Sequence, residues 1–237
     1  MPMKWQLHNV DAIPWLIDQS SDDYDALVTD PPYSSGGLHA GARTSDSANA
    51  KYINDPGKYP EFTGENRDQF SHMQWSTLWL THAHRVLRAG APVMVFTDWR
   101  QLPVMTSALQ AAGFTWRGIV VWDKTEGVRP QKGRFRQQSE FVIWGSKGKW
   151  HSSDGPVLPG VFRHSVTAGG PKMHTTGKPV PLMSDLIKAC PSGTILDPFA
   201  GSGSTGLAAI RSGRFFVGCE REEAYFNIAC ERLSNTA

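Results

Sequence analysis

Four consecutive residues combine a carboxylate, two prolines and an aromatic ring: Asp30-Pro31-Pro32-Tyr33. They follow a short apolar run, 26–29, which predicts a strand that ends at the sheet edge where open α/β folds bind ligands. Proline lacks an N–H and has a fixed φ, so the Asp30 carboxylate and the Pro31 carbonyl form two rigid acceptors beside the Tyr33 ring. The amino group of a planar base, with two N–H donors and a π-face, complements this arrangement. An ordinary Asp-Pro turn with a core tyrosine is the alternative.

A glycine-rich turn near the C-terminus favours the chemical interpretation. It lies between a predicted strand, 194–196, and a predicted helix, 204–211, and Glu220 ends the next strand. Glycines let the backbone approach a ligand closely, and an acidic residue at that distance can accept hydrogen bonds from ribose hydroxyls. The pattern predicts a nucleotide-cofactor site formed by Asp197-Pro198-Phe199-Ala200-Gly201-Ser202-Gly203-Ser204-Thr205-Gly206.

Gly201, Gly203 and Gly206 also spell GxGxxG, the pattern of a nicotinamide dinucleotide site. Two features argue against that ligand. The chain ends at residue 237, too soon after Gly206 for the rest of a dinucleotide-binding fold unless the motif order is permuted. Asp197, directly before the turn, would repel a pyrophosphate. S-adenosylmethionine carries an ammonium and a sulfonium and no phosphate, so it suits this turn better.

Basic residues gather in one glycine-containing segment between two predicted strands. Such a loop suits contact with DNA phosphates, whereas an ordinary solvated loop is the alternative. The residues that we expect to bind DNA are Lys124, Arg129, Lys132, Arg134 and Arg136.

Strands alternate with helices along the chain, which predicts an α/β fold with a mostly parallel twisted sheet and helices on both faces. We expect strands at 26–29, 92–97, 119–122, 140–144, 194–196 and 215–218, and helices at 70–88, 100–112, 179–189, 204–211 and 222–233. Residues 1–237 form a single domain in this interpretation, with irregular insertions at about 34–67 and about 124–176.

Composition excludes several classes of protein. Hydrophobic residues make up 40% of the 237 residues and charged residues 19%, which is typical of a globular protein. No apolar run approaches the roughly 20 residues of a membrane helix. The three cysteines form no CxxC pair, so we expect neither a metal site nor disulfides, and a cytoplasmic location. A net charge of +2 neither requires nor excludes nucleic acid.

The two motifs together resemble the DNA amino-methyltransferases, which methylate N6 of adenine or N4 of cytosine. The tetrapeptide precedes Phe199-Ala200-Gly201-Ser202-Gly203, an order that resembles the permuted β group of that family. The resemblance implies a Rossmann-like, S-adenosylmethionine-dependent methyltransferase fold, double-stranded DNA as partner and, in some members, a homodimer. It extends over most of the chain through the segments 9–12, 24–30, 139–144 and 176–182.

The resemblance also implies roles for individual residues. Asp30, Pro31, Pro32 and Tyr33 would be catalytic, with Asp30 also near the cofactor. The glycine turn would hold the methionine part of the cofactor and Glu220 its ribose, with Lys178 and Pro179 near the methionine carboxylate. Asp11 would lie near the adenine. The residues that would contact the cofactor are therefore Asp11, Asp30, Lys178, Pro179, Asp197, Phe199, Gly201, Gly203 and Glu220.

The target amine is paired and stacked in a duplex, so the base must leave it before Tyr33 can stack on the ring. Because Asp and not Ser leads the tetrapeptide, adenine N6 is favoured over cytosine N4. A nicotinamide-dependent oxidoreductase and a catalytically silent nucleic-acid-binding module remain the alternatives from other classes, and RNA or protein could also accept the methyl group. The target sequence cannot be read from the chain, and residues 124–176 are short for a target-recognition region.

Overall fold

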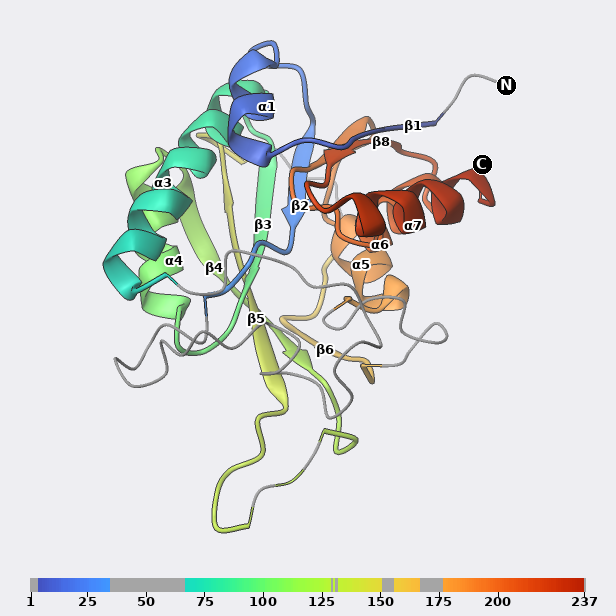
Figure 1. The fold of residues 1–237 in the computed structure, drawn as a ribbon. Helices are drawn as coiled ribbons and strands as arrows, with labels where there is room; N and C mark the ends of the chain where they lie inside the picture. The colour runs from blue at the N-terminus through green and yellow to red at the C-terminus, as the bar shows by residue number, and fades with distance from the viewer. Residues whose placement is uncertain are drawn as a thin grey trace.

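A computed structural model describes residues 4–34, 67–128, 130, 132–150, 156–166 and 177–236. Its centre is an eight-stranded sheet in the order β1-β8-β7-β2-β3-β5-β4-β6 (Figure 1). β5 runs antiparallel to both of its neighbours, and every other pair of adjacent strands is parallel. The strands are β1 (Trp5–His8), β2 (Ala26–Thr29), β3 (Pro92–Thr97), β4 (Thr115–Asp123), β5 (Ser139–Ser146), β6 (Val161–Arg163), β7 (Thr194–Asp197) and β8 (Phe215–Cys219).

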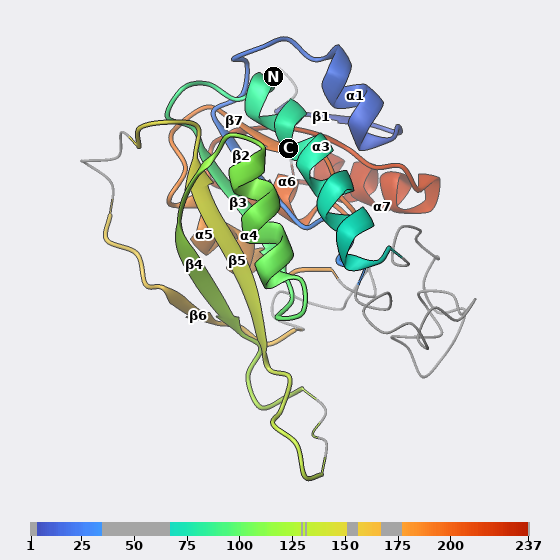
Figure 2. The same ribbon diagram turned by 90° about the vertical axis from the view of Figure 1, so that its left-hand side faces the viewer.

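Helices cover both faces of this sheet (Figure 1, Figure 2). One face carries α1 (Ala12–Asp18), α3 (Gln69–Val86) and α4 (Leu102–Ala111). The other carries α5 (Val180–Ile187), α6 (Ser204–Arg211) and α7 (Glu223–Ser234). Crossovers between parallel strands are right-handed, so connections that run in opposite directions across the sheet place their helices on opposite faces. The α/β fold with helices on both faces, predicted from the sequence, is confirmed.

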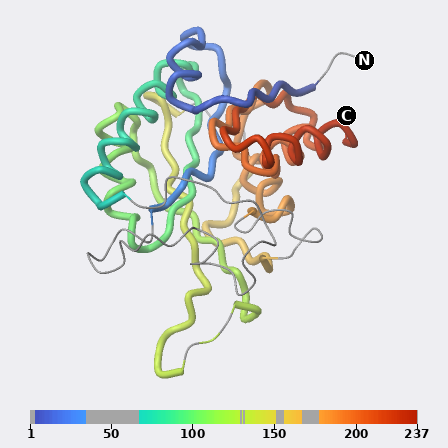
Figure 3. Tube along the Cα trace, viewed as in Figure 1, coloured from blue at the N-terminus to red at the C-terminus, as the bar shows by residue number. Residues whose placement is uncertain are grey.

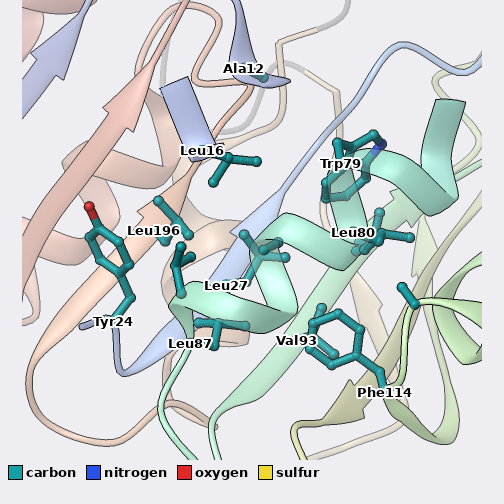
Figure 4. Packing of buried hydrophobic residues seen from close by; sticks show 14 of the residues in the cluster. Ala12, Leu16, Tyr24, Leu27, Trp79, Leu80, Leu87, Val93, Phe114 and Leu196 are labelled. Atoms are coloured by element: carbon teal, nitrogen blue, oxygen red, sulfur yellow. The ribbon is translucent and has the colours of Figure 1, made fainter. Parts of the chain in front are cut away.

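Two hydrophobic cores result from the alternation of side chains along each strand. Leu27 of β2 and Leu196 of β7 face α1 and α3 (Figure 4). Their neighbours Val28 and Ile195 face α5 and α6 on the other side. All four side chains are fully buried, as expected for central parallel strands that are covered on both faces.

The direction of the connections reverses between β7 and β2. From β7 the chain passes through α6 to β8 on one side, whereas from β2 it passes through α3 to β3 on the other. Open α/β sheets bind ligands in the crevice beyond the carboxyl ends of the strands at such a reversal. The tetrapeptide follows β2 and the glycine turn follows β7, so both flank this crevice.

Most expected elements are present, with a few differences. The sequence pattern did not predict β1, α1 or β6, which are short, and β4 begins at Thr115 instead of residue 119. β1 alternates between half-buried and exposed positions at the sheet edge, which gives it no continuous apolar run. Apart from its ends, the expected insertion 34–67 lies outside the described residues. No helix in the described part of the chain has the length and apolar character that a membrane crossing requires.

Candidate active site

The Asp30 carboxylate, at the edge of the crevice, has one partner nearby in the sequence and one from a distant part of the chain. The Asp30 carboxylate accepts a hydrogen bond from the Tyr33 hydroxyl at Oδ1, 2.7 Å away. Its other oxygen, Oδ2, lies 2.7 Å from Nζ of Lys178, whose side chain is only 5% exposed. Asp30 of the tetrapeptide and Lys178, two residues before α5, therefore form an ion pair with a buried ammonium.

Glu140, the second residue of β5, extends this network. Its Oε2 lies 3.2 Å from Nζ of Lys178, and its Oε1 lies 3.1 Å from Nζ of Lys124. The Tyr33 hydroxyl also lies 3.1 Å from Oε2 of Glu140, so its single proton is shared between the two carboxylates. Two ammonium groups thus balance two carboxylates in the order Asp30, Lys178, Glu140, Lys124.

Burial and charge shift the pKa values of this network in different directions. Burial raises the pKa of Asp30 above its ordinary value, because the Lys178 ammonium offsets only part of the desolvation. Burial also acts to raise the pKa of Glu140, but Lys178 and Lys124 together hold it below the usual value. Burial would lower the pKa of Lys178, yet Asp30 and Glu140 raise it above that of a free lysine. Burial and the two carboxylates raise the pKa of Tyr33 well above 10. Lys178 is therefore an ammonium and Tyr33 a neutral phenol.

Aromatic rings surround the Lys178 ammonium. Its Nζ lies 5.0 Å from the centre of the Tyr33 ring, 5.2 Å from that of Phe96 and 6.0 Å from that of Trp122. The negative faces of such rings attract a cation, which fixes the ammonium beside Asp30.

The glycine turn has a backbone conformation in which other residue types would be strained. Gly201 has φ 51° and Gly203 has φ 82°, both in the left-handed region. A Cβ on Gly203 would lie 3.1 Å from Cβ of Ala229 in α7. A Cβ on Gly206 would lie 2.8 Å from side-chain atoms of Leu233 and Phe216. Close packing of α6 accounts for Gly206, so the third glycine of GxGxxG does not require a dinucleotide.

Asp197 holds the start of the turn through hydrogen bonds. Its side chain is buried, and Oδ1 accepts hydrogen bonds from Oγ1 of Thr29 at 2.6 Å and from the backbone N of Phe199 at 3.0 Å. Burial raises the pKa of Asp197 to about 6. The Thr29 contact joins the end of β2 to the end of β7, so Asp197 couples the turn to the segment that carries Asp30.

Glu220, after β8, faces the same turn. The backbone N of Gly201 donates to Oε2 of Glu220 at 2.8 Å, and that of Glu222 donates to Oε1 at 2.8 Å. Burial raises the pKa of Glu220. A carboxylate has about four lone-pair sites, so each oxygen retains capacity for a further donor.

Asp11, near Glu220, and Phe199, within the turn, have partners in other elements. Asp11 caps α1 by accepting from the backbone N of Ile13 at 3.1 Å, and its carboxylate lies 3.6 Å from Arg221, next to Glu220. The Phe199 ring packs on two tryptophans of α3, with centroid distances of 5.5 Å to Trp75 and 5.1 Å to Trp79.

The structure separates the residues expected at the cofactor and at DNA. Four of the residues expected at the cofactor belong to the turn: Asp197, Phe199, Gly201 and Gly203. Glu220 accepts a hydrogen bond from the turn, and Asp11 lies near Arg221, the residue after Glu220. Lys178, expected near the methionine carboxylate, lies against Asp30 and Glu140, and Pro179 is the N-cap of α5. Lys124 binds Glu140, and Arg136 donates to backbone oxygens of Glu126 and Val128. Lys132 and Arg134 are exposed, and Arg129 lies outside the described residues.

Sequence reasoning missed three residues of the site: Glu140, Phe96 and Trp122. Glu140 is the second residue of β5 and directly precedes its apolar run, and a charged residue at that position was the available signal. Its partners lie far away in the chain, so no local spacing indicated them.

Comparisons with known proteins agree on one family. A family model described as DNA methylase, of the N6/N4 type, matches residues 24–231. The type II methyltransferase M2.DpnII of Streptococcus pneumoniae is 28% identical over 251 residues, which cover 97% of this chain and 90% of that protein.

Solved structures share the fold at low sequence identity. A complex of M1.HpyAVI with SAM superposes with a TM-score of 0.69 at 23% identity, covering 97% of this chain and 98% of the other. The PvuII DNA methyltransferase, specific for cytosine N4, superposes with a TM-score of 0.74 at 16% identity, covering 98% of this chain and 91% of the other. The described fold is therefore that of these methyltransferases.

Proposed function

This chain belongs to the N6/N4 family of DNA methylases, and from that premise we propose that it transfers a methyl group from S-adenosylmethionine to N6 of adenine in double-stranded DNA. The observation that carries the proposal is the position of the two motifs. Asp30 and the glycine turn lie at the ends of adjacent parallel strands, β2 and β7, on either side of the point where the connections change direction across the sheet.

The residues around the glycine turn fit the cofactor. The glycines, which have no side chain, leave the backbone open to close approach, and Glu220 retains lone pairs for hydroxyl donors. Asp11, Asp197 and Glu220 give this region a negative charge, which suits an ammonium and a sulfonium. When bound, S-adenosylmethionine supplies an electrophilic methyl group. The likeness to the M1.HpyAVI–SAM complex supports the same choice.

The tetrapeptide is suited to hold the accepting amine. Each Asp30 oxygen already accepts one hydrogen bond, from Tyr33 or from Lys178, and keeps a lone pair for an N–H donor. The Pro31 carbonyl supplies a second acceptor, and Tyr33 supplies a ring on which a flipped base stacks. We infer that Lys178 keeps Asp30 ionised, because burial alone would favour the neutral acid.

The choice of adenine rests on the leading Asp30. Cytosine N4 is the second candidate, because the family model includes both bases and the PvuII enzyme is specific for cytosine N4. Mass spectrometry of deoxynucleosides from DNA treated with the enzyme separates the two: N6-methyl-2′-deoxyadenosine supports the proposal, and N4-methyl-2′-deoxycytidine as the only product contradicts it.

Two alternatives from other classes lose their support. Packing explains Gly206 without a dinucleotide, and the family is not one of oxidoreductases. The intact tetrapeptide with its buried ion pair supports a catalytic enzyme over a catalytically silent binding module.

We further propose that residues 1–237 act as one methyltransferase domain in the cytoplasm. Light scattering tests whether the enzyme is the homodimer that the resemblance allows.

A further inference from the structure

A long loop between β4 and β5 extends away from the rest of the molecule (Figure 1, Figure 2, Figure 3). We call the described residues of this loop, 124–128, 130 and 132–138, the β4–β5 arm. In the arm, Phe135 stands between two arginines in the sequence and is 95% exposed. An exposed aromatic ring beside two cationic side chains, Arg134 and Arg136, is suited to nucleic acid, because the ring can stack on bases while cations contact phosphates.

Contacts at the root hold the arm in place. The backbone N of Lys124 donates to O of Gln138 at 2.7 Å, and the Gln138 side chain donates to Oδ1 of Asp123 at 3.0 Å. Arg136 donates to the Val128 carbonyl, 3.1 Å away, across the arm. The arm is therefore braced from within, and none of these contacts involves the Phe135 side chain.

The arm begins at the active site. Lys124, its first residue, pairs with Glu140, which shares Lys178 with Asp30. The carboxyl ends of β2 and β4 lie at the same sheet edge, because β5 runs antiparallel to both β3 and β4. The arm therefore leaves the sheet at the same edge as Asp30, where a duplex would present the target base.

We propose that Phe135 enters the base stack of the DNA and fills the space that the extruded target base leaves, while Lys132 and Arg134 bind the adjacent phosphates. This inference rests on the proposed function. Extrusion of a base loses stacking and pairing energy, and an apolar side chain inserted into the gap restores part of it. Cations beside the wedge attach it to the phosphate backbone without reading sequence.

The test compares two duplexes that carry the methylated sequence found for the wild-type enzyme. One is fully paired, and in the other the target base faces an abasic site, so that extrusion breaks no base pair. Loss of one base–aromatic stack corresponds to roughly 5- to 150-fold. We expect Phe135→Ala to lower kcat/KM on the paired duplex by that factor and to act nearly like wild type on the abasic one. Phe135→Trp should retain activity on both.

Trp116→Ala is the matched control, because Trp116 is another exposed aromatic residue at the opposite end of β4. It should leave both rates unchanged. The fluorescence of 2-aminopurine at the target position gives a second readout, and its rise on binding should be smaller with Phe135→Ala than with wild type. Equal losses on both duplexes, or no loss on either, would overturn the wedge. Absence of methylation by the wild-type enzyme would instead refute the proposed function.

Discussion

The Lys178 ammonium is the most informative point at which to perturb the network. Lys178→Met keeps the length of the side chain and removes the charge that Asp30 and Glu140 share. Removal of one partner of a buried pair costs about 3–5 kcal/mol, because the other charge is left without compensation. For a domain of this size, that loss corresponds to a decrease in Tm of about 6–20 °C.

The same change should alter the pH dependence of methyl transfer. The Lys178 ammonium lowers the pKa of Asp30, so its removal raises that pKa further and shifts the ascending limb of the kcat profile to higher pH. The raised pKa of Lys178 in the folded state means that its stabilisation is complete below about 10.4, the value of an unfolded lysine. It is lost only above that pH, so the difference in Tm should stay constant between pH 7 and pH 9.

Circular dichroism measures the Tm, and transfer of labelled methyl to DNA measures the profile. Lys188→Met is the control, because Lys188 is 59% exposed and its pair with Asp185 should contribute little. Without Lys178, Asp30 and Glu140 share only the charge of Lys124, which pairs with Glu140. Adding Glu140→Gln to Lys178→Met removes one of these two carboxylates, so it should restore part of the Tm. The reasoning is wrong if Lys178→Met melts like Lys188→Met and keeps the wild-type pH profile.

Two further predictions concern the cofactor and DNA. Glu220→Gln should weaken binding of S-adenosylhomocysteine by about 10- to 100-fold in calorimetry, since a hydrogen bond to a charged group is lost; unchanged affinity would remove Glu220 from the cofactor site. Arg134→Ala should reduce the slope of log Kobs against log salt by about 0.9, the contribution of one phosphate contact, and an unchanged slope would place Arg134 outside the interface.

The sequence predicted the central strands well, because their signal is local. The expected strand 92–97 matches β3 residue for residue, as a buried parallel strand is a continuous apolar run. The edge elements β1 and β6 were missed, because their short, half-exposed segments depend on pairing with strands distant in sequence.

The candidate site divides in the same way. Asp30, Asp197 and Glu220 could be placed at one edge from sequence, because each lies at the end of a strand or directly after it and the strands are parallel. The position of Lys178 could not, since its contact with Asp30 joins residues 148 positions apart. The role of Glu140 is likewise set by tertiary packing, which brings Lys124 and Lys178 to the same carboxylate.

The most direct test of the central claim compares the wild-type enzyme with Asp30→Ala. Calorimetry with S-adenosylhomocysteine measures cofactor binding at the glycine turn. Transfer of labelled methyl to DNA measures the catalytic function of the tetrapeptide. We expect Asp30→Ala to bind the cofactor product as wild type does and to lose methyl transfer. Transfer of labelled methyl to DNA by Asp30→Ala at near the wild-type rate would contradict the assignment of Asp30 as the residue that holds the accepting amine.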